Sequence, residues 1–202
     1  LPAPTIKDGT AHFQSTLYTG NGTAIGSGGL AVSQSENSTF QPDLVWIKER
    51  NGAADHALYD AVRGTTKDLA SNNSNAETTE TEGLTAFDAA GFTVGNLAKV
   101  NTSSDTYVAW QWLAANSTAS NSDGSIASTV SANTTSGFSI VTYTGDGNDN
   151  ATVGHGLGVT PKTVWLLPRS NGDNKQVSNW ETGVTAFTED LKLNVAEAAN
   201  SS

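Results

Sequence analysis

Side chains that could carry out catalysis are few in this chain, and they do not form a known catalytic or metal-binding pattern. The three histidines, His12, His56 and His155, stand far apart in the sequence, and cysteine is absent. A zinc site needs histidine, cysteine or carboxylate ligands at short, regular spacings, so none is expected. His56 follows Asp55, but neighbouring residues on a strand face opposite sides, which argues against an acid–base pair. The sequence therefore predicts no catalytic residues.

One loop carries part of a calcium-binding pattern. Asp146, Asn148 and Asn150 place oxygen-bearing side chains at alternate positions, as Ca²⁺-binding loops do. The sixth position of the loop is Ala151 instead of glycine, and the twelfth is Leu157 instead of glutamate. We therefore expect no cofactor, with Ca²⁺ bound at this loop as the alternative.

Two Gly-x-Gly turns have a superficial likeness to phosphate-binding loops. They are Gly20-Asn21-Gly22 and Gly145-Asp146-Gly147. A dinucleotide-binding loop needs a third glycine at a set position and a helix after it, and neither is present here. We interpret both as tight hairpin turns that require positive φ angles.

The elements around these turns occur twice. Residues 13–22 read FQSTLYTGNG, and residues 138–147 read FSIVTYTGDG. In each copy a proline later starts a short hydrophobic run with a tryptophan four residues after it, Trp46 in the first copy and Trp165 in the second. Self-similarity of this kind indicates two copies of one structural unit.

Composition and charge exclude several classes of protein. The chain has 202 residues, a net charge of −10 and only ten basic residues, which are scattered singly. A nucleic-acid-binding protein would need a clustered basic stripe to neutralise phosphates, so no nucleic-acid partner is expected. No apolar run approaches the length needed to cross a bilayer, so membrane insertion is not expected either.

Short apolar runs bounded by Gly, Pro, Asn and Ser predict an all-β chain of two tandem, related β-sandwich-like units. A closed barrel or a prism is the alternative architecture. We expect residues 1–12 to be an extended lead-in and residues 13–113 to be the first unit. The Ser/Thr/Asn-rich residues 114–136 are expected to be a linker. Residues 137–202 are expected to be a second unit that is truncated, because no counterpart of the Trp110/Trp112 strand follows.

The tryptophans could form either a hydrophobic core or a platform for sugars. Strand alternation predicts that Val108, Trp110 and Trp112 share one face. Trp46 and Trp165 occupy matching places in hydrophobic runs, as core residues of a sandwich do. We therefore predict that these tryptophans belong to the core. Trp180 lies in a polar stretch, and we expect it to be exposed.

Several of these segments resemble repeated domains of tailed-bacteriophage virion proteins, of the type found in marine phages and cyanophages and described as tail-fibre-like. The matching segments are 1–8 (LPAPTIKD), 18–22 (YTGNG), 40–48 (FQPDLVWIK), 58–64 (LYDAVRG) and 107–112 (YVAWQW). Residues 137–169 resemble the unit that follows in such proteins. The resemblance implies an extracellular protein of the virion surface. The lack of a catalytic pattern predicts that it has no enzymatic activity.

Three functions are compatible with these observations. The first is a tail-fibre or adhesin segment that presents a host-attachment surface, as a homo-oligomer such as a trimer, in contact with other virion proteins and a host surface glycan. The second is a decoration or cement protein on the capsid exterior. The third is a carbohydrate-binding accessory module of a depolymerase, which is the least supported because no carboxylate pair stands out. For a glycan ligand, the predicted contacts are Tyr59, Trp180, Asn21 and Asp146.

Overall fold

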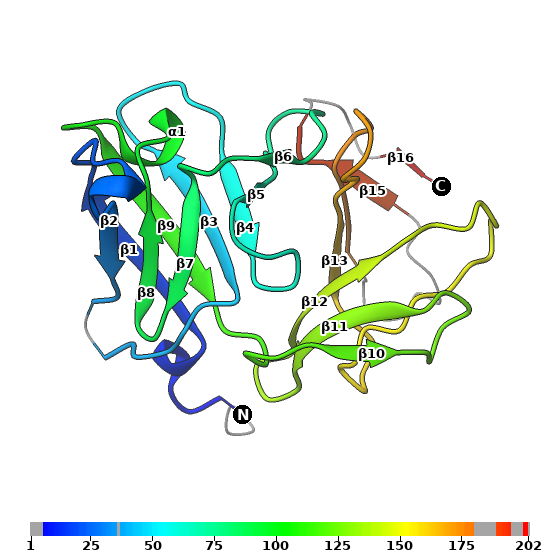
Figure 1. The fold of residues 1–202 in the computed structure, drawn as a ribbon. Coiled ribbons are helices and arrows are strands. Elements are labelled where there is room, and N and C mark those ends of the chain that lie inside the picture. Colours follow the sequence, from blue (N-terminus) through cyan, green and yellow to red (C-terminus); the bar gives the residue numbers. More distant parts are fainter. Residues whose placement is uncertain (1–5, 36, 180–188, 195–199, 202) are drawn as a thin grey trace.

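The computed structural model describes residues 6–35, 37–179, 189–194 and 200–201. Its regular structure is nearly all antiparallel β-strand, which confirms the predicted all-β, sandwich-like fold (Figure 1). Helical elements in the described ranges are short: η1 (Gly9–Ala11), η2 (Ile25–Ser27) and α1 (Ala98–Asn101). No helix among them is long and apolar enough to span a membrane.

The first unit is a sandwich of two antiparallel sheets. The four-stranded sheet has the order β1 (Phe13–Thr19), β9 (Thr106–Trp112), β3 (Leu44–Glu49), β4 (Ala57–Asp60). The three-stranded sheet has the order β2 (Leu30–Ser33), β8 (Gly91–Val94), β7 (Leu84–Asp88). A small two-stranded sheet, β5 (Lys67–Asp68) and β6 (Thr78–Thr79), lies beside β4.

Alternation along the strands determines which side chains enter the core. In β9 every second residue is buried, so that Tyr107, Ala109 and Gln111 face inward. The inward residues of β3 are Val45 and Ile47, and the opposite sheet contributes Phe92 and Val94. Burial of apolar area at roughly 25 cal/mol per Å² makes this cluster the main source of the unit's stability.

The second unit begins earlier than the sequence predicts. Residues 114–136, expected to be a linker, contain β10 (Ala119–Asn121) and β11 (Ser128–Asn133), which form a sheet with β12 (Phe138–Tyr143) in the order β10-β11-β12. The linker prediction was wrong because small polar residues replace apolar ones in β11. Ser128 is buried, and its hydroxyl donates to the Gly154 carbonyl (3.0 Å), so the strand loses no hydrogen bond on burial.

The rest of the second unit forms a further sheet. Its order is β13 (Thr163–Leu166), β14 (Gln176–Asn179), β15 (Glu189–Lys192), β16 (Asn200–Ser201). At the other end of the chain, the described part of the expected lead-in includes η1, whose first turn is capped by the Asp8 side chain.

The internal repeat is clearest in two hairpins. In the β3–β4 hairpin Trp46 pairs with Leu58, and in the β13–β14 hairpin Trp165 pairs with Val177. The partner follows its tryptophan at the same sequence distance in both copies, so the two hairpins share one register. The sheets around them differ: β9 joins β1 to β3 in the first unit, whereas β12 and β13 of the second unit belong to separate sheets.

The matching tryptophans pack against each other, and they do not lie in the sandwich core. Trp46, Trp110 and Trp112 are half-buried on the outer face of the four-stranded sheet, because the inward positions of β3 and β9 hold other residues. The Trp165 ring packs edge-on against Trp46 with centroids 5.3 Å apart, and Phe138 stacks on Trp112 at 6.2 Å. The prediction that they fill the core was therefore wrong, and their shared face was correctly predicted. These rings join the two units.

Removing the Trp165 ring should weaken the contact between the units. We expect Trp165→Ala to lower the free energy of unfolding by about 1–3 kcal/mol, because the packing of the Trp165 ring is lost and the face of Trp46 beneath it is exposed. Leu166→Ala is the matched control, since Leu166 is the next residue of β13 and is 38% exposed. Chemical denaturation of both variants measures the difference. Equal losses in the two variants would show that the Trp46–Trp165 contact does not hold the units together.

Candidate functional site

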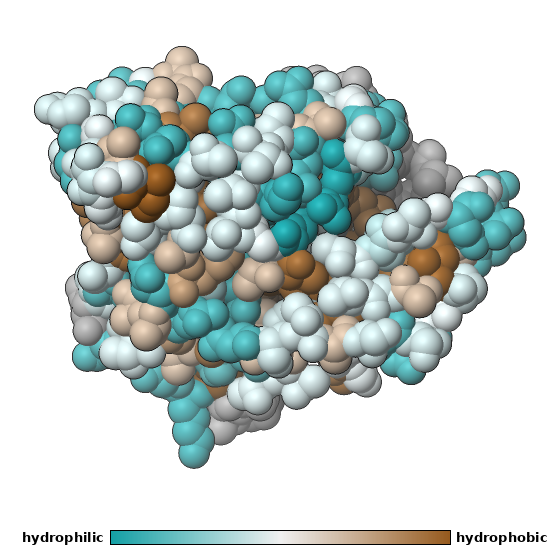
Figure 2. Space-filling view, in the orientation of Figure 1, coloured by the Kyte–Doolittle hydropathy of each residue, from teal (hydrophilic) through white to brown (hydrophobic). Residues whose placement is uncertain are grey.

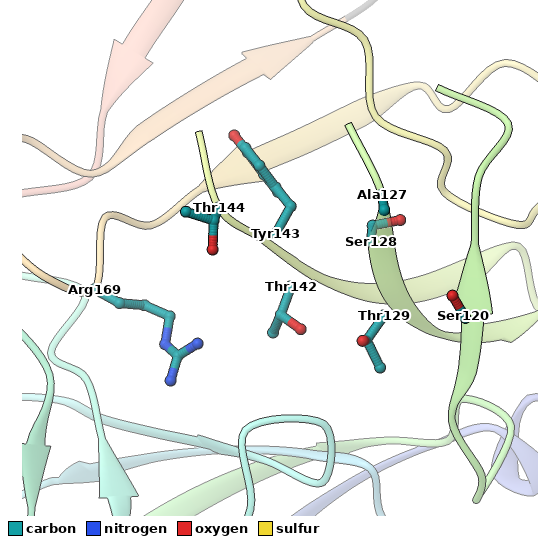
Figure 3. A pocket seen from close by; sticks show the side chains of 8 residues that line it. All are labelled: Ser120, Ala127, Ser128, Thr129, Thr142, Tyr143, Thr144 and Arg169. Carbon is teal, nitrogen blue, oxygen red and sulfur yellow. The ribbon is translucent and has the colours of Figure 1, made fainter. Parts of the chain in front are cut away.

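A groove lined mainly by hydroxyl groups lies where the second unit meets the first. Its volume is about 340 Å³ (Figure 3). We call it the hydroxyl groove, and its lining consists of Ser120, Ala127, Ser128, Thr129, Thr142, Tyr143, Thr144 and Arg169. Most of these residues lie in β10, β11 and β12. Ala127 immediately precedes β11, Thr144 immediately follows β12, and Arg169 follows β13.

Strand register places three of the hydroxyl-bearing residues in a row. Ser120 of β10 pairs with Thr129 of β11, and Thr129 pairs in turn with Thr142 of β12. Residues paired in this way project from the same side of the sheet, with neighbouring Cβ atoms about 5 Å apart. Thr129 is exposed, and Thr142 is half-buried. The row therefore presents a set of donors and acceptors at regular spacing across three strands.

An aromatic side chain stands at the rim of the groove. Tyr143 is 45% exposed, and it points away from the side of the sheet that bears Thr129 and Thr142 (Figure 3). Strand alternation explains this direction, because Tyr143 directly follows Thr142. An exposed tyrosine ring combines an apolar face with a polar hydroxyl, a combination suited to contact with a sugar ring.

Arg169 is held in place by a carboxylate of the first unit. Its Nε and Nη2 atoms donate to the two carboxylate oxygens of Glu77, at 2.9 and 2.8 Å. The Glu77 backbone N–H donates to the Arg169 carbonyl at 2.8 Å. A bidentate pair fixes the guanidinium plane as well as its position. The Arg169 side chain is nevertheless 44% exposed, so its remaining N–H groups are accessible from the groove.

Glu77 also accepts from Arg63, a buried arginine of the first unit. The Arg63 Nη1 atom lies 2.9 Å from the Glu77 carboxylate, and its Nε atom pairs with Asp60. Burial alone would raise the pKa of Glu77, but the hydrogen bonds from Arg169 and Arg63 outweigh burial and lower it. The same contact with Glu77 raises the pKa of Arg169. Both groups therefore remain charged at neutral pH.

Hydrophilic side chains gather on the surface next to this junction. Figure 2 shows its strongest hydrophilic colour over the β4–β6 region of the first unit, where that region approaches the second unit. Apolar residues are scattered over the rest of the face. The groove thus offers hydroxyls and one fixed guanidinium, and the exposed Tyr143 ring lies on the other side of the sheet. Such a set can form hydrogen bonds to sugar hydroxyls and a charge-assisted pair with an anionic substituent.

The structure does not bring the sequence-predicted contact residues together. Tyr59 is fully buried in the core of the first unit, so the prediction that it contacts a ligand was wrong. It lies in β4, where all four residues are buried because β5 and the second sheet cover the strand. Trp180 lies outside the described residues. The turns at Asn21 and Asp146 belong to different units, and their segments lie on opposite sides of Figure 1.

Asn21 has a local structural role. Its side-chain oxygen accepts from the Thr23 backbone N–H at 2.8 Å and from the Asn101 amide at 3.1 Å. Asn101 is fully buried and also bonds to the Gly95 carbonyl. The three contacts tie the turn after β1 to the end of α1, which accounts for the Asn21 side chain without a ligand.

Asp146 lies two residues beyond Thr144, close to the groove in the sequence. Its two carboxylate oxygens accept from the backbone N–H and the side-chain amide of Asn148, at 3.0 and 2.8 Å. These hydrogen bonds lower the pKa of Asp146. In the described part of the chain, no three His, Cys, Asp or Glu side chains are grouped closely enough to hold a metal ion. The Asp146, Asn148 and Asn150 loop is an exposed Asx-type turn.

Sequence reasoning missed the hydroxyl row and the role of Arg169. Ser120 and Thr129 fell within the presumed linker, and a threonine in a polar segment carries no sign of the strand that will pair with it. Arg169 did carry a signal, because it occupies the same place in its repeat as Arg50 does in the first copy. That signal identifies a repeated position without showing its partner Glu77.

A second cluster of ionisable and aromatic groups lies at the contact between the units. The Trp46 indole N–H donates to Nδ1 of His56 at 2.8 Å, so His56 must be neutral at that nitrogen. Burial and the nearby Lys48 charge lower the pKa of His56, against a smaller opposing effect of Asp55. His56 is therefore a half-buried histidine held by the Trp46 indole.

The lowered pKa of His56 makes stability depend on pH in a defined direction. The folded-state pKa of His56 lies below the unfolded value of about 6.5. Above the unfolded-state pKa the histidine does not change the free energy of unfolding, and as pH falls below it the free energy of unfolding decreases. We therefore expect the wild type to lose more stability than His56→Gln on going from about pH 7.5 to about pH 5. Thermal unfolding of both proteins at the two pH values measures this. Parallel losses would show that His56 does not couple the fold to pH.

Comparison with known proteins identifies the family. Residues 8–202 match the model of a family described as a domain of unknown function, DUF7483, and the chain belongs to that family. No curated protein and no solved structure matches the chain.

Proposed function

We propose that this member of the DUF7483 family is a non-enzymatic attachment module on a virion surface, and that it binds a host surface glycan in the hydroxyl groove. The observation that carries the proposal is the combination of the cross-strand row of Ser120, Thr129 and Thr142 with a guanidinium fixed beside it. The resemblance of the sequence to tail-fibre-like virion proteins supports a location on the virion surface.

The chemistry of the groove favours a sugar over other ligands. Sugar hydroxyls pair with protein hydroxyls and with charged donors such as a guanidinium. The groove has little apolar lining and lacks the enclosed shape of a site for an apolar small molecule. Arg169 favours a glycan that carries a carboxylate or sulfate group, because a guanidinium can donate hydrogen bonds to two oxygens of such a group.

An open groove of this size would bind one sugar weakly. Weak single contacts become effective when several copies engage a surface together. Attachment by this chain would therefore be strengthened by a homo-oligomer, such as a trimer, that places several grooves on one side. The net charge of −10 opposes non-specific adsorption to anionic cell surfaces, which leaves the short-range contacts of the groove to decide the target.

Removing the hydroxyls should weaken glycan binding without unfolding the sheet. We expect Thr129→Val with Thr142→Val to weaken binding roughly tenfold or more, since each lost hydrogen bond is worth about 1 kcal/mol. Valine keeps the branched shape and strand preference of threonine. Thr134→Val is the matched control, because Thr134 is exposed in the hairpin between β11 and β12 and does not line the groove. Binding of multimerised protein to a glycan array and to host cells provides the measurement.

Two variants that each remove one positive charge test the role of Arg169. Arg169→Ala should weaken binding to acidic glycans more than to neutral ones, whereas Lys162→Ala removes an exposed positive charge of the same unit from outside the groove. Glycan binding by the wild type that survives all groove substitutions would locate the site elsewhere. Absence of binding to any glycan or host cell, together with many copies of the chain on the capsid, would instead indicate a decoration protein.

A further inference from the structure

A lysine and an aspartate are in direct contact inside the first unit. Lys99 lies on α1, and its Nζ atom contacts the Oδ2 atom of Asp68 on β5. The Asp68 side chain is 1% exposed and that of Lys99 is 23% exposed. The contact links α1, which follows β8 of the three-stranded sheet, to β5, which lies beside β4 of the four-stranded sheet.

The surroundings of this contact are poorly suited to a permanent ion pair. The second carboxylate oxygen of Asp68, Oδ1, is buried and lacks a hydrogen-bond partner among the described residues, and so does the neighbouring Tyr59 hydroxyl. A buried carboxylate normally has both oxygens satisfied, because an unsatisfied buried charge is costly. Burial, followed by repulsion from Glu80, raises the pKa of Asp68 despite the contact with Lys99.

A second carboxylate is directed to the same place. In the β5–β6 ladder Asp68 pairs with Thr78, and Glu80 follows two residues later. Alternation places Glu80 on the side of Asp68, whereas Lys67 points outward and donates to Thr79. Glu80 is half-buried, and its charge raises the pKa of both Asp68 and Tyr59, so it lies close to both groups. A half-buried carboxyl group thus lies beside the buried carboxyl group that contacts Lys99.

We propose that Lys99 and Asp68 join spontaneously in the folded protein through an amide bond between Lys99 Nζ and Asp68 Cγ. The elements needed are a primary amine in contact with a carboxyl group, a site shielded from water, and a neighbouring carboxylate that can move protons. Holding the two reactants in contact replaces a bimolecular step with an intramolecular one, which is the main barrier to forming an amide in water. Lys99, Asp68 and Glu80 supply these elements.

The reaction is a condensation that releases one water molecule. Glu80 accepts a proton from the Lys99 ammonium and delivers it to Asp68 Oδ2, which yields a neutral amine and a neutral carboxylic acid. The amine lone pair then attacks Asp68 Cγ, so that a C–N bond forms. Oδ2 leaves with its own proton and a second proton that Glu80 transfers from the nitrogen. The C–Oδ2 bond breaks, Oδ1 remains as the amide carbonyl oxygen, and Glu80 returns to its starting state.

The bond would close the chain between residues 68 and 99 into a covalent loop. That loop contains β6, β7 and β8, so the cross-link would fasten the three-stranded sheet to the β5 border of the other sheet. A cross-link that closes a long loop stabilises a protein mainly by restricting its unfolded state. Because the chain has no cysteine, it can form no disulfide for this purpose. The inference is independent of the glycan-binding proposal.

Intact-mass spectrometry of the purified, folded chain tests the proposal directly. We expect a mass lower than that of the sequence by one water molecule. After digestion, tandem spectra should show the peptide containing Asp68 joined to the peptide containing Lys99. A succinimide at an aspartate also loses water, but it hydrolyses in mild base and joins no second peptide. An unchanged mass after prolonged incubation of the folded protein would overturn the proposal.

Variants assign the individual roles. Lys99→Arg and Asp68→Ala should both show the full mass of their sequences, and both should migrate more slowly than the wild type on denaturing gels, because the loop is open. Glu80→Gln should remain unlinked or form the bond at least tenfold more slowly, while circular dichroism shows the same fold. Cross-linking of Glu80→Gln at the wild-type rate would contradict the proton-transfer role of Glu80. A wild-type linkage that uses any other lysine or acid would contradict the assigned site.

Discussion

The relation between the two units depends on the carboxylate of Glu77. It receives hydrogen bonds from Arg63 of the first unit and Arg169 of the second, and its backbone N–H binds the Arg169 carbonyl. Without this carboxylate Arg169 would lose the two hydrogen bonds that fix its guanidinium, whereas Arg63 would keep its contacts with Asp60 and with the Leu58 and Lys67 carbonyls. Nearby, the buried Lys175 donates to the carbonyls of Asn75 and Pro168 at 3.1 Å, which joins the same two segments again.

The aromatic contact and the polar junction have complementary effects. Trp46 and Trp165 bury apolar surface between the units, but apolar packing alone does not fix the orientation of one unit relative to the other. The charged groups at Glu77 fix this orientation, because a bidentate arginine–carboxylate contact has a defined geometry. The hydroxyl groove results from both effects. The second unit provides the row of hydroxyls, and the first unit fixes the guanidinium that faces it.

The sequence was sufficient to predict the architecture and insufficient to predict the site. Alternation correctly placed Val108, Trp110 and Trp112 on one face. The duplicated Pro-to-Trp runs indicated a repeated structural unit, and both runs lie in hairpins of the same register. Alternation does not reveal what covers that face, so the half-buried tryptophans between the two units were wrongly predicted to be core residues. Tyr59 was expected to be exposed because a tyrosine near turn residues gives no sign that β5 will cover it. The strand β11 was missed because Ser128 and Ser131 are satisfied by hydrogen bonds that depend on the tertiary fold.

The central claim is that the first unit positions Arg169 over a sugar-binding row of hydroxyls in the second unit. Its most direct test is nuclear magnetic resonance titration of the isotope-labelled chain with acidic and neutral glycans. The account predicts that signal shifts concentrate at Ser120, Thr129, Thr142 and the Arg169 side-chain Nε–H. Shifts that cluster on another surface of the chain, or the absence of shifts with glycans from a susceptible host, would contradict it.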